Sequence, residues 1–190
     1  MAEEKSKNSK RPVLAVALLL AVTMVLGLIG LFTDFIPNKP VKIVGACIAT
    51  LLMIITFVFG RGMAIFKPHF NKRWLKFIES LFGGCMLLFL YWVSVAYAIP
   101  SIYTQLTGQP REMIEIVSPF HMPATKECDY KIENDFIKGT ARGFICITKE
   151  WYELNETKYL LYGYQSELGF HVRGAVPLKD LQRYIDSLGN

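Results

Sequence analysis

Three long apolar runs, separated by short basic segments, constrain this 190-residue chain more than any other feature. They cover residues 12–32, 41–60 and 80–100, and they contain no charged residue apart from Lys42 at the edge of the second run. A helix needs about 20 predominantly apolar residues to cross the hydrocarbon core of a bilayer. We therefore expect three transmembrane helices, which places the two ends of the chain on opposite sides of a membrane.

The distribution of Lys and Arg sets the orientation of these helices. Basic residues gather in the tail 1–11 and in the loop 61–79, whereas the link 33–40 contains only Lys39. Positive charge in short loops stays on the cytoplasmic side. We expect the tail and the 61–79 loop inside, and the link and residues 101–190 outside, with a bacterial inner membrane favoured over a eukaryotic one.

A cleaved signal peptide is the alternative for the first run. The run is longer than a typical signal-peptide core, and no small-x-small cleavage site follows it. A retained helix is the better interpretation.

The net charge differs between the two halves of the chain. Residues 1–103 carry a net charge of +7 and residues 104–190 a net charge of −2. The basic character therefore belongs to the membrane part, where it is explained by orientation. It gives no reason to expect a basic nucleic-acid-binding domain, and we expect no nucleic-acid partner.

Residues near the ends of the runs are expected to anchor them at the membrane surface. Lys and Arg interact with anionic headgroups, and Trp and Tyr favour the headgroup level. A cytoplasmic protein partner is the alternative role for the loop residues. Pro100 is expected to end the third helix. The expected anchors are Lys72, Arg73, Trp74, Lys76, Trp92 and Tyr97.

Small residues in the first two helices allow two interpretations. Gly27 and Gly30 lie in the first run, and Gly45 and Ala49 lie in the second. Such residues often mark close contacts between helices in lipid, but Gly is also simply frequent in membrane helices.

Residues 101–190 are expected to form a small, mainly β domain outside the membrane. Short segments with alternating apolar residues, rich in β-branched and aromatic side chains, predict strands. Their number favours a small barrel or a curled sheet. Helices are expected at 149–154 and, at the C-terminus, at 178–188. The expected strands are residues 112–118, 128–133, 142–148, 158–164 and 169–173.

The four cysteines divide between membrane and outer domain. Cys47 and Cys85 lie in the apolar runs and are expected to be inert, whereas Cys128 and Cys146 lie in expected strands on the oxidising side. Such a pair is expected to form a disulfide. The alternative is a metal site in which this pair is joined by His121 or His171, but the spacing matches no zinc motif.

No segment of the sequence predicts an enzyme. Gly163–Gly169 and Gly139–Gly143 match neither a nucleophile elbow nor a phosphate loop. No ionisable residue lies at membrane depth, which disfavours a transporter or channel. We expect no catalytic residue, no metal and no cofactor. Asn155 begins a formal glycosylation triplet, which carries little weight.

Two classes of function remain. In the first, the outer domain binds an envelope protein, either as an accessory subunit of an assembly or as an immunity protein against a toxin. The expected contact residues, on the tip of a hairpin, are Tyr164, Gln165, Glu167 and Arg173, since Tyr and Arg are enriched at interface hot spots.

The second class is binding or modification of a lipid or small ligand at the outer leaflet. Tyr97, Tyr103 and Arg111 are the candidate headgroup contacts. The bilayer itself is an expected partner in both classes, and association of several copies is compatible with either.

Overall fold

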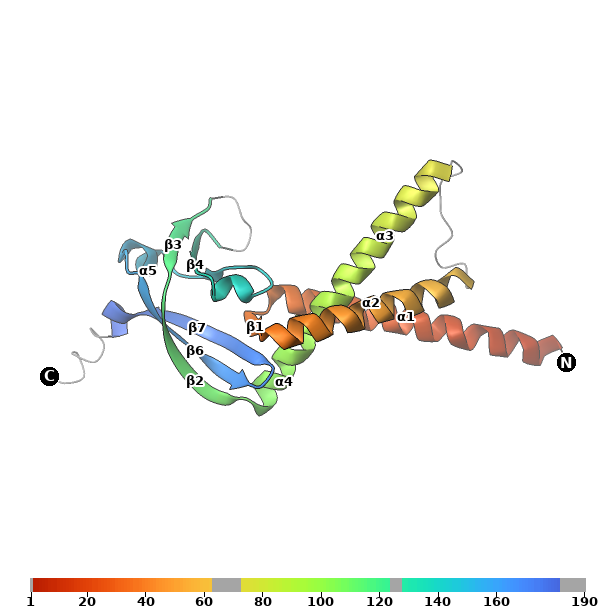
Figure 1. Ribbon diagram of the computed structural model, residues 1–190, viewed down its shortest axis with the longest axis horizontal. Coiled ribbons are helices and arrows are strands. Elements are labelled where there is room, and N and C mark those ends of the chain that lie inside the picture. Colours follow the sequence, from red (N-terminus) through yellow and green to blue (C-terminus); the bar gives the residue numbers. More distant parts are fainter. Residues whose placement is uncertain (1, 63–72, 124–127, 182–190) are drawn as a thin grey trace.

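The computed structural model describes residues 2–62, 73–123 and 128–181, and it joins long helices to a compact β domain (Figure 1). The long helices are α1 (Ala2–Phe32), α2 (Lys39–Gly62) and α3 (Arg73–Val93), and α3 continues through the π-helix η1 (Ser94–Ala98) into α4 (Ile99–Thr107). The β domain adds the short helices η2 (Ile137–Gly139) and α5 (Lys149–Glu153). The strands are β1 (Phe35–Pro37), β2 (Gln109–Ile116), β3 (Ser118–His121), β4 (Tyr130–Glu133), β5 (Ile145–Cys146), β6 (Lys158–Ser166) and β7 (Gly169–Pro177).

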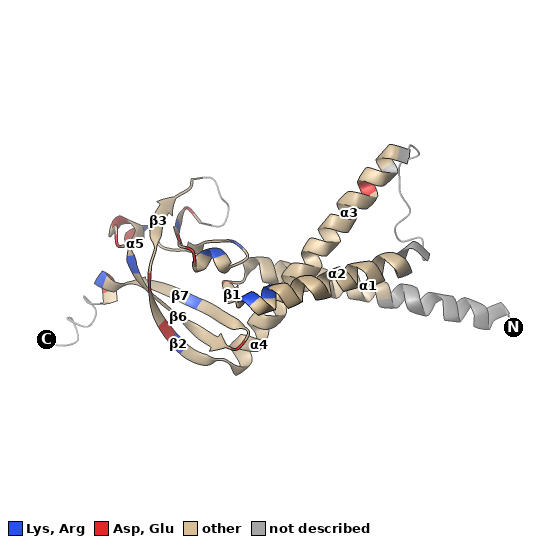
Figure 2. Cartoon of the chain, in the orientation of Figure 1, with Lys and Arg blue, Asp and Glu red and all other residues tan. Residues whose placement is uncertain are grey.

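Two helices are long and apolar enough to cross a membrane by length and composition. They are Lys39–Val58 in α2 and Phe77–Thr107 through α3, η1 and α4. The described apolar part of α1, Val16–Phe32, is shorter, so the structure does not support all three expected spans. Figure 2 shows little charge along the described middle of these helices.

The helices meet near the β domain and separate away from it. In Figure 1, the far end of α3 lies apart from α1 and α2. The glycines lie where the helices touch. A Cβ on Gly30 would lie 2.8 Å from the Val93 carbonyl oxygen, and one on Gly45 would lie 2.9 Å from the Cβ of Ala96. Of the two interpretations of these small residues, close helix contact is therefore the one observed.

Hydroxyl groups add hydrogen bonds between the helices. The hydroxyls of Thr56 in α2 and Tyr91 in α3 lie 2.7 Å apart and are buried. Ser94 donates to the carbonyl oxygens of Thr23 in α1 (3.1 Å) and Leu90 in its own helix (2.7 Å). Such bonds satisfy polar groups that have no water to bind.

The expectation that Pro100 ends the third helix is wrong. The helix continues to Thr107, so that α4 reaches the β domain. Proline removes one helical hydrogen bond and its ring clashes with the preceding turn. Here Pro100 lies at the start of α4, directly after the five-residue π-helix η1, and such wide turns let a helix accommodate this disruption.

The β domain consists of two antiparallel sheets. Their strand orders are β1-β7-β6-β2 and β3-β4-β5. The chain passes from β2 to β3 through the single buried residue Val117, which links the sheets. The core between them includes Ile132, Ile145, Leu161 and Phe170. The expected mixture of helices and an antiparallel β domain is confirmed.

The link between α1 and α2 contributes an edge strand to this domain. Residues Phe35, Ile36 and Pro37 pair with His171, Phe170 and Gly169 of β7. We expected only an outer loop at 33–40, because three residues that end in proline give too short a pattern to predict a strand. The first sheet therefore combines segments from the two ends of the chain.

Most expected strands are found, with shifted ends. Residues 112–118, 128–133, 158–164 and 169–173 contain most of β2, β4, β6 and part of β7, and the expected helix at 149–154 is α5. The strand expected at 142–148 is reduced to two residues, since Gly143 has a φ of 77°. Strand β3 was missed. The helix expected at 178–188 begins at residue 178, and its part beyond 181 lies outside the described residues.

Cys128 and Cys146 form the expected disulfide, with an S–S distance of 2.09 Å. Their sequence separation is 18 residues. Cys146 lies in β5 and pairs with Lys131 of β4, so that the bridge reinforces the smaller sheet. The other two cysteines, Cys47 and Cys85, are unbridged and exposed on the helices.

We expect replacement of Gly30 by alanine to destabilise the protein. The new methyl group must displace backbone atoms of the third helix, and overpacking of this kind costs about 1–3 kcal/mol. Gly84→Ala is the matched control, because a Cβ there meets nothing within 4 Å. Thermal unfolding of the full chain in detergent should show a lower midpoint for Gly30→Ala only.

Removal of the disulfide should lower the free energy of unfolding by about 3 kcal/mol. Without the bridge, the loop between the two cysteines is no longer closed in the unfolded chain, and the conformational entropy of the unfolded state rises. The variant is Cys128→Ser with Cys146→Ser, and the measurement is denaturant unfolding of the β domain signal in the full chain. Cys47→Ser is the control. Equal stability of the two variants would contradict a stabilising role for the bridge.

Candidate functional site

The sheet β1-β7-β6-β2 has one face toward the core and one face outward, and α4 covers the end of the outward face next to the long helices. Ser101 and Thr104 of α4 are fully buried there. The Ser101 hydroxyl lies 3.0 Å from Nδ1 of His171, and the Thr104 hydroxyl lies 2.7 Å from that of Ser166. The third helix is thus joined to both central strands by direct polar contacts.

The turn between β6 and β7 is held against the same helices. Asn38, just before α2, donates from its side chain to the Glu167 carbonyl oxygen (2.8 Å) and from its backbone to that of Leu168 (3.0 Å). Tyr103 of α4 donates to the Glu167 carboxylate (2.8 Å). A Cβ on Gly169 would lie 2.3 Å from the Ile36 carbonyl oxygen, so the close approach of β1 requires glycine there.

The four residues expected to bind a partner all lie at this turn. The Arg111 side chain donates to the Gln165 side chain, and Arg173 donates to the Tyr164 hydroxyl at 3.2 Å. The Glu167 carboxylate accepts a hydrogen bond from the Tyr103 hydroxyl. The hairpin tip therefore faces the long helices, and much of its hydrogen-bonding capacity is used within the chain. Partner binding there stays a prediction.

The expected membrane anchors are placed differently from one another. Trp74 of α3 is exposed, Trp92 is half-buried, and Tyr97 is buried, with its ring edge-on to Trp92 at a centroid distance of 5.3 Å. Tyr97 was also a candidate headgroup contact, with Tyr103 and Arg111, and the structure gives each of these side chains a contact within the chain. Lys72 and the side chains of Arg73 and Lys76 lie outside the described residues.

Asp34 and Arg142 form an ion pair next to the buried contact between Ser101 and His171. Arg142 Nη2 lies 2.5 Å from Asp34 Oδ1, and both side chains are largely shielded from solvent. The Asp34 carbonyl oxygen also accepts from the backbone N–H of Val172. Burial of the imidazole lowers the pKa of His171 below its ordinary value of 6.5, while the Asp34 charge opposes this shift and the Arg173 charge adds to it.

This arrangement does not favour catalysis. A serine next to a histidine suggests a nucleophile, but Ser101 has no exposed surface, and a nucleophile must reach its substrate. Among the described residues, no three His, Cys, Asp or Glu side chains gather as a metal site. The alternative of a metal site with Cys128, Cys146 and a histidine is not observed, because the two cysteines are joined in the expected disulfide. His121 stacks on Tyr130 at a centroid distance of 4.9 Å. The polar cluster fits best as a structural connection.

The part of the outward sheet face that α4 leaves uncovered carries exposed apolar side chains, bordered by Glu112 and Lys158, which pair with Tyr162 and Ile116. Ile114 and Ile116 of β2 are 61% and 69% exposed, and Tyr162 of β6 is 40% exposed. Ile114 pairs with Leu160, which in turn pairs with Val176 of β7, so the three strands share the surface. We call Ile114, Ile116, Leu160, Tyr162 and Val176 the distal patch.

The distal patch borders an open strand edge. In the described part of the chain β2 pairs only with β6. The backbone N–H of Val117 donates to Thr157 on the β6 side, whereas the carbonyl oxygen of Ile116 faces Asn134. Alternate residues face the same neighbour in an antiparallel ladder. Glu112 and Ile114 therefore direct their backbone groups to the open side.

The sequence contained a signal for this surface that we did not use. In the run Met113-Ile114-Glu115-Ile116, apolar residues fall on both faces of the strand. Met113 packs on the core, so the two isoleucines must face outward. A strand with apolar residues on both faces needs a cover for each face or exposes one.

No family model, no curated protein and no solved structure matches the chain.

Acidification should destabilise the protein partly through His171. Because its pKa is lower in the folded state, the unfolded chain binds the proton more readily below about pH 6.5. Stability from this group is complete above that pH and decreases as the pH falls toward the folded-state pKa. The unfolding midpoint of the full chain should therefore be lower at pH 5.5 than at pH 7.5.

The variant His171→Gln should reduce this difference relative to the unsubstituted chain. Glutamine can still bond Ser101, so the comparison separates titration from loss of the contact. If the unfolding midpoint of His171→Gln differed between the two pH values as much as that of the unsubstituted chain, the assignment of this pH dependence to His171 would be contradicted.

Proposed function

We propose that the protein is a multi-pass inner-membrane protein whose periplasmic β domain binds an envelope protein, without an enzymatic activity of its own. The observation that carries the proposal is the distal patch, an exposed apolar surface beside an unpaired strand edge. Exposed contiguous apolar surface marks interaction sites in proteins that otherwise cover it.

Membrane location is supported by the surface of the helices. Only 17% of the span window in α2 is buried within the chain, whereas the core helix of a soluble protein is mostly buried. The helical segment 16–32 of α1 packs on the third helix through Gly30 and completes three crossings in the proposal. Basic residues in the tail and in the 61–79 loop favour a cytoplasmic N-terminus.

An extended segment of another protein is the partner that suits the distal patch. A strand added to β2 would hydrogen-bond the open backbone groups and lay alternate side chains over Ile114 and Ile116, as in β-augmentation.

A second copy of this chain suits the distal patch less well. Strand β2 begins beside α4 and runs away from the helices (Figure 1).

Two copies in one membrane are related by an axis along its normal. Their β2 strands would then run in the same direction, whereas two-fold pairing of identical edges is antiparallel.

Two roles follow from this type of binding. The protein is an accessory subunit of an envelope assembly, or it is an immunity protein that blocks a toxin acting at the membrane or in the periplasm. Deletion of the gene separates them: sensitivity to sibling cells supports immunity, and a disturbed envelope assembly supports the accessory role.

Site-specific photo-crosslinking in the native membrane tests the proposal. A photoreactive residue at position 114 should capture one stoichiometric protein, identified by mass spectrometry, because this position lies at the centre of the distal patch. The same residue at position 122 is the matched control, since Met122 is also exposed, at 48%, but lies beyond β3 on the other sheet.

Substitution should confirm the surface. Ile114→Lys with Ile116→Lys should reduce capture at least tenfold, because hot-spot residues at the centre of an interface cost more than about 2 kcal/mol when lost. Capture that survives this change but is lost with Tyr164→Ala and Arg173→Ala would move the interface to the hairpin turn. Capture of no protein at either surface would overturn the proposal.

A further inference from the structure

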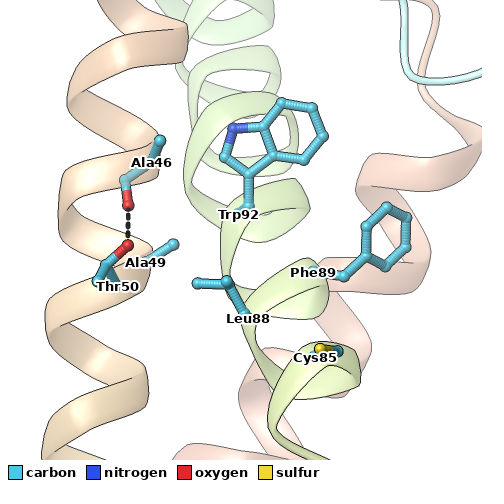
Figure 3. Close-up of a pocket in the computed structure, with 7 residues that line it drawn as sticks. All are labelled: Ala46, Ala49, Thr50, Cys85, Leu88, Phe89 and Trp92. Atoms are coloured by element: carbon cyan, nitrogen blue, oxygen red, sulfur yellow. Dashed lines mark hydrogen bonds between the residues drawn. The ribbon is translucent and has the colours of Figure 1, made fainter. Parts of the chain in front are cut away.

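A groove opens where α3 diverges from α2. It has a volume of about 380 Å³, within the range of small-ligand sites. Its lining residues, labelled in Figure 3, are Ala46, Ala49 and Thr50 of α2 and Cys85, Leu88, Phe89 and Trp92 of α3.

The lining is apolar in effect, although it contains one hydroxyl. Thr50 donates to the Ala46 carbonyl oxygen of its own helix at 2.9 Å (Figure 3), so that its methyl group is left for the groove. The small side chains on α2 face large ones on α3, and the groove therefore has the form of a slot along the helices. An apolar slot of this kind holds a hydrocarbon chain rather than a polar solute.

The outer end of the groove is marked by positive charge. Lys39 and Lys42 lie in the first turn of α2, beyond the residues that line the groove, and Lys42 Nζ lies beside Gly139, 3.8 Å from the position of a Cβ there. Neither lysine forms an ion pair with another described residue. Residues 39, 46 and 50 share one face of a helix with 3.6 residues per turn. Lys39 therefore lies above the groove, about 10 Å from Ala46 along the helix axis.

Two further features favour an anion at this end. The positive end of the α2 dipole lies in the same turn. Trp92 lies toward the Ala46 end of the groove and Cys85 toward the opposite end (Figure 3), so that an indole N–H is present near the level expected for headgroups.

We propose that this groove binds one anionic phospholipid of the outer leaflet, with an acyl chain between α2 and α3 and the phosphate near Lys39 and Lys42. The inference rests on the proposed membrane location but not on the proposed protein partner. The lipid fills the space between the diverging helices, on the side of their close contact that lies away from the β domain. This site differs from the headgroup contacts first expected at Tyr97, Tyr103 and Arg111.

Native mass spectrometry of the full chain in detergent tests the lipid class. Titration with phosphatidylglycerol should give one bound lipid at concentrations where phosphatidylcholine gives little binding. Lys39→Gln with Lys42→Gln should weaken phosphatidylglycerol binding roughly tenfold or more, since each basic residue contributes to attraction of anionic headgroups. Lys149→Gln with Lys158→Gln, exposed on the β domain, is the charge-matched control.

Alkylation of the two unbridged cysteines shows where the acyl chain of the lipid binds, and it uses the protein without substitutions. Cys85 lines the groove, and Cys47 is exposed elsewhere on α2. Phosphatidylglycerol should slow the reaction of Cys85 with a lipophilic maleimide several-fold and leave that of Cys47 unchanged. Ala46→Trp, which fills the groove, should abolish lipid binding, whereas Val44→Trp on the exposed side of α2 should not.

The outcomes separate this inference from the proposed function. Equal binding of the two lipids, or equal protection of the two cysteines, overturns the lipid site while the protein stays in membranes after carbonate extraction. A dimer that Ala46→Trp dissociates would assign the groove to a helix of a second copy, which also overturns the proposal. Release of the protein by carbonate would contradict the membrane location itself.

Discussion

The pairing of β1 with β7 is the interaction on which the arrangement of this protein depends. Three residues between α1 and α2 form an edge strand of a sheet whose other strands begin more than 70 residues later. The Asp34–Arg142 ion pair and the contacts of Asn38 with the β6–β7 turn hold the two ends of this strand. Because α1 and α2 leave from the two ends of β1, their position relative to the β domain is fixed by the sheet.

The third helix makes a second connection, which would be absent if the helix ended at Pro100. Its extension α4 buries Ser101 and Thr104 against the sheet and covers the end of the outward face next to the long helices. The wide turn of η1 accommodates the proline. The same helix diverges from α2 at its other end, so that close packing near the β domain and an open groove further away are two consequences of one crossing.

These connections cover one end of the sheet and leave the other end open. The β6–β7 turn, which has the residue types of an interface, is occupied by contacts with α4 and Asn38. The distal half of the same sheet has no cover and keeps an open strand edge. The tyrosine and arginine at the hairpin tip form contacts within the chain, and partner binding by them stays a prediction. The exposed isoleucines of β2 mark the surface that we propose for a partner.

Local patterns in the sequence were sufficient for two long apolar helices, for most strands of the β domain and for the cysteine pair, since periodicity depends on nearby residues. They were insufficient for β1, for the continuation through Pro100 and for which sheet face is covered. Those features depend on contacts between segments far apart in the chain. The three residues of β1 form a strand because they can pair with the edge of β7. The helix continues past Pro100 because the residues that follow form α4 and reach the β domain. The sequence by itself determined which segments are apolar enough for lipid, and the tertiary structure decided which surfaces remain open to bind anything else.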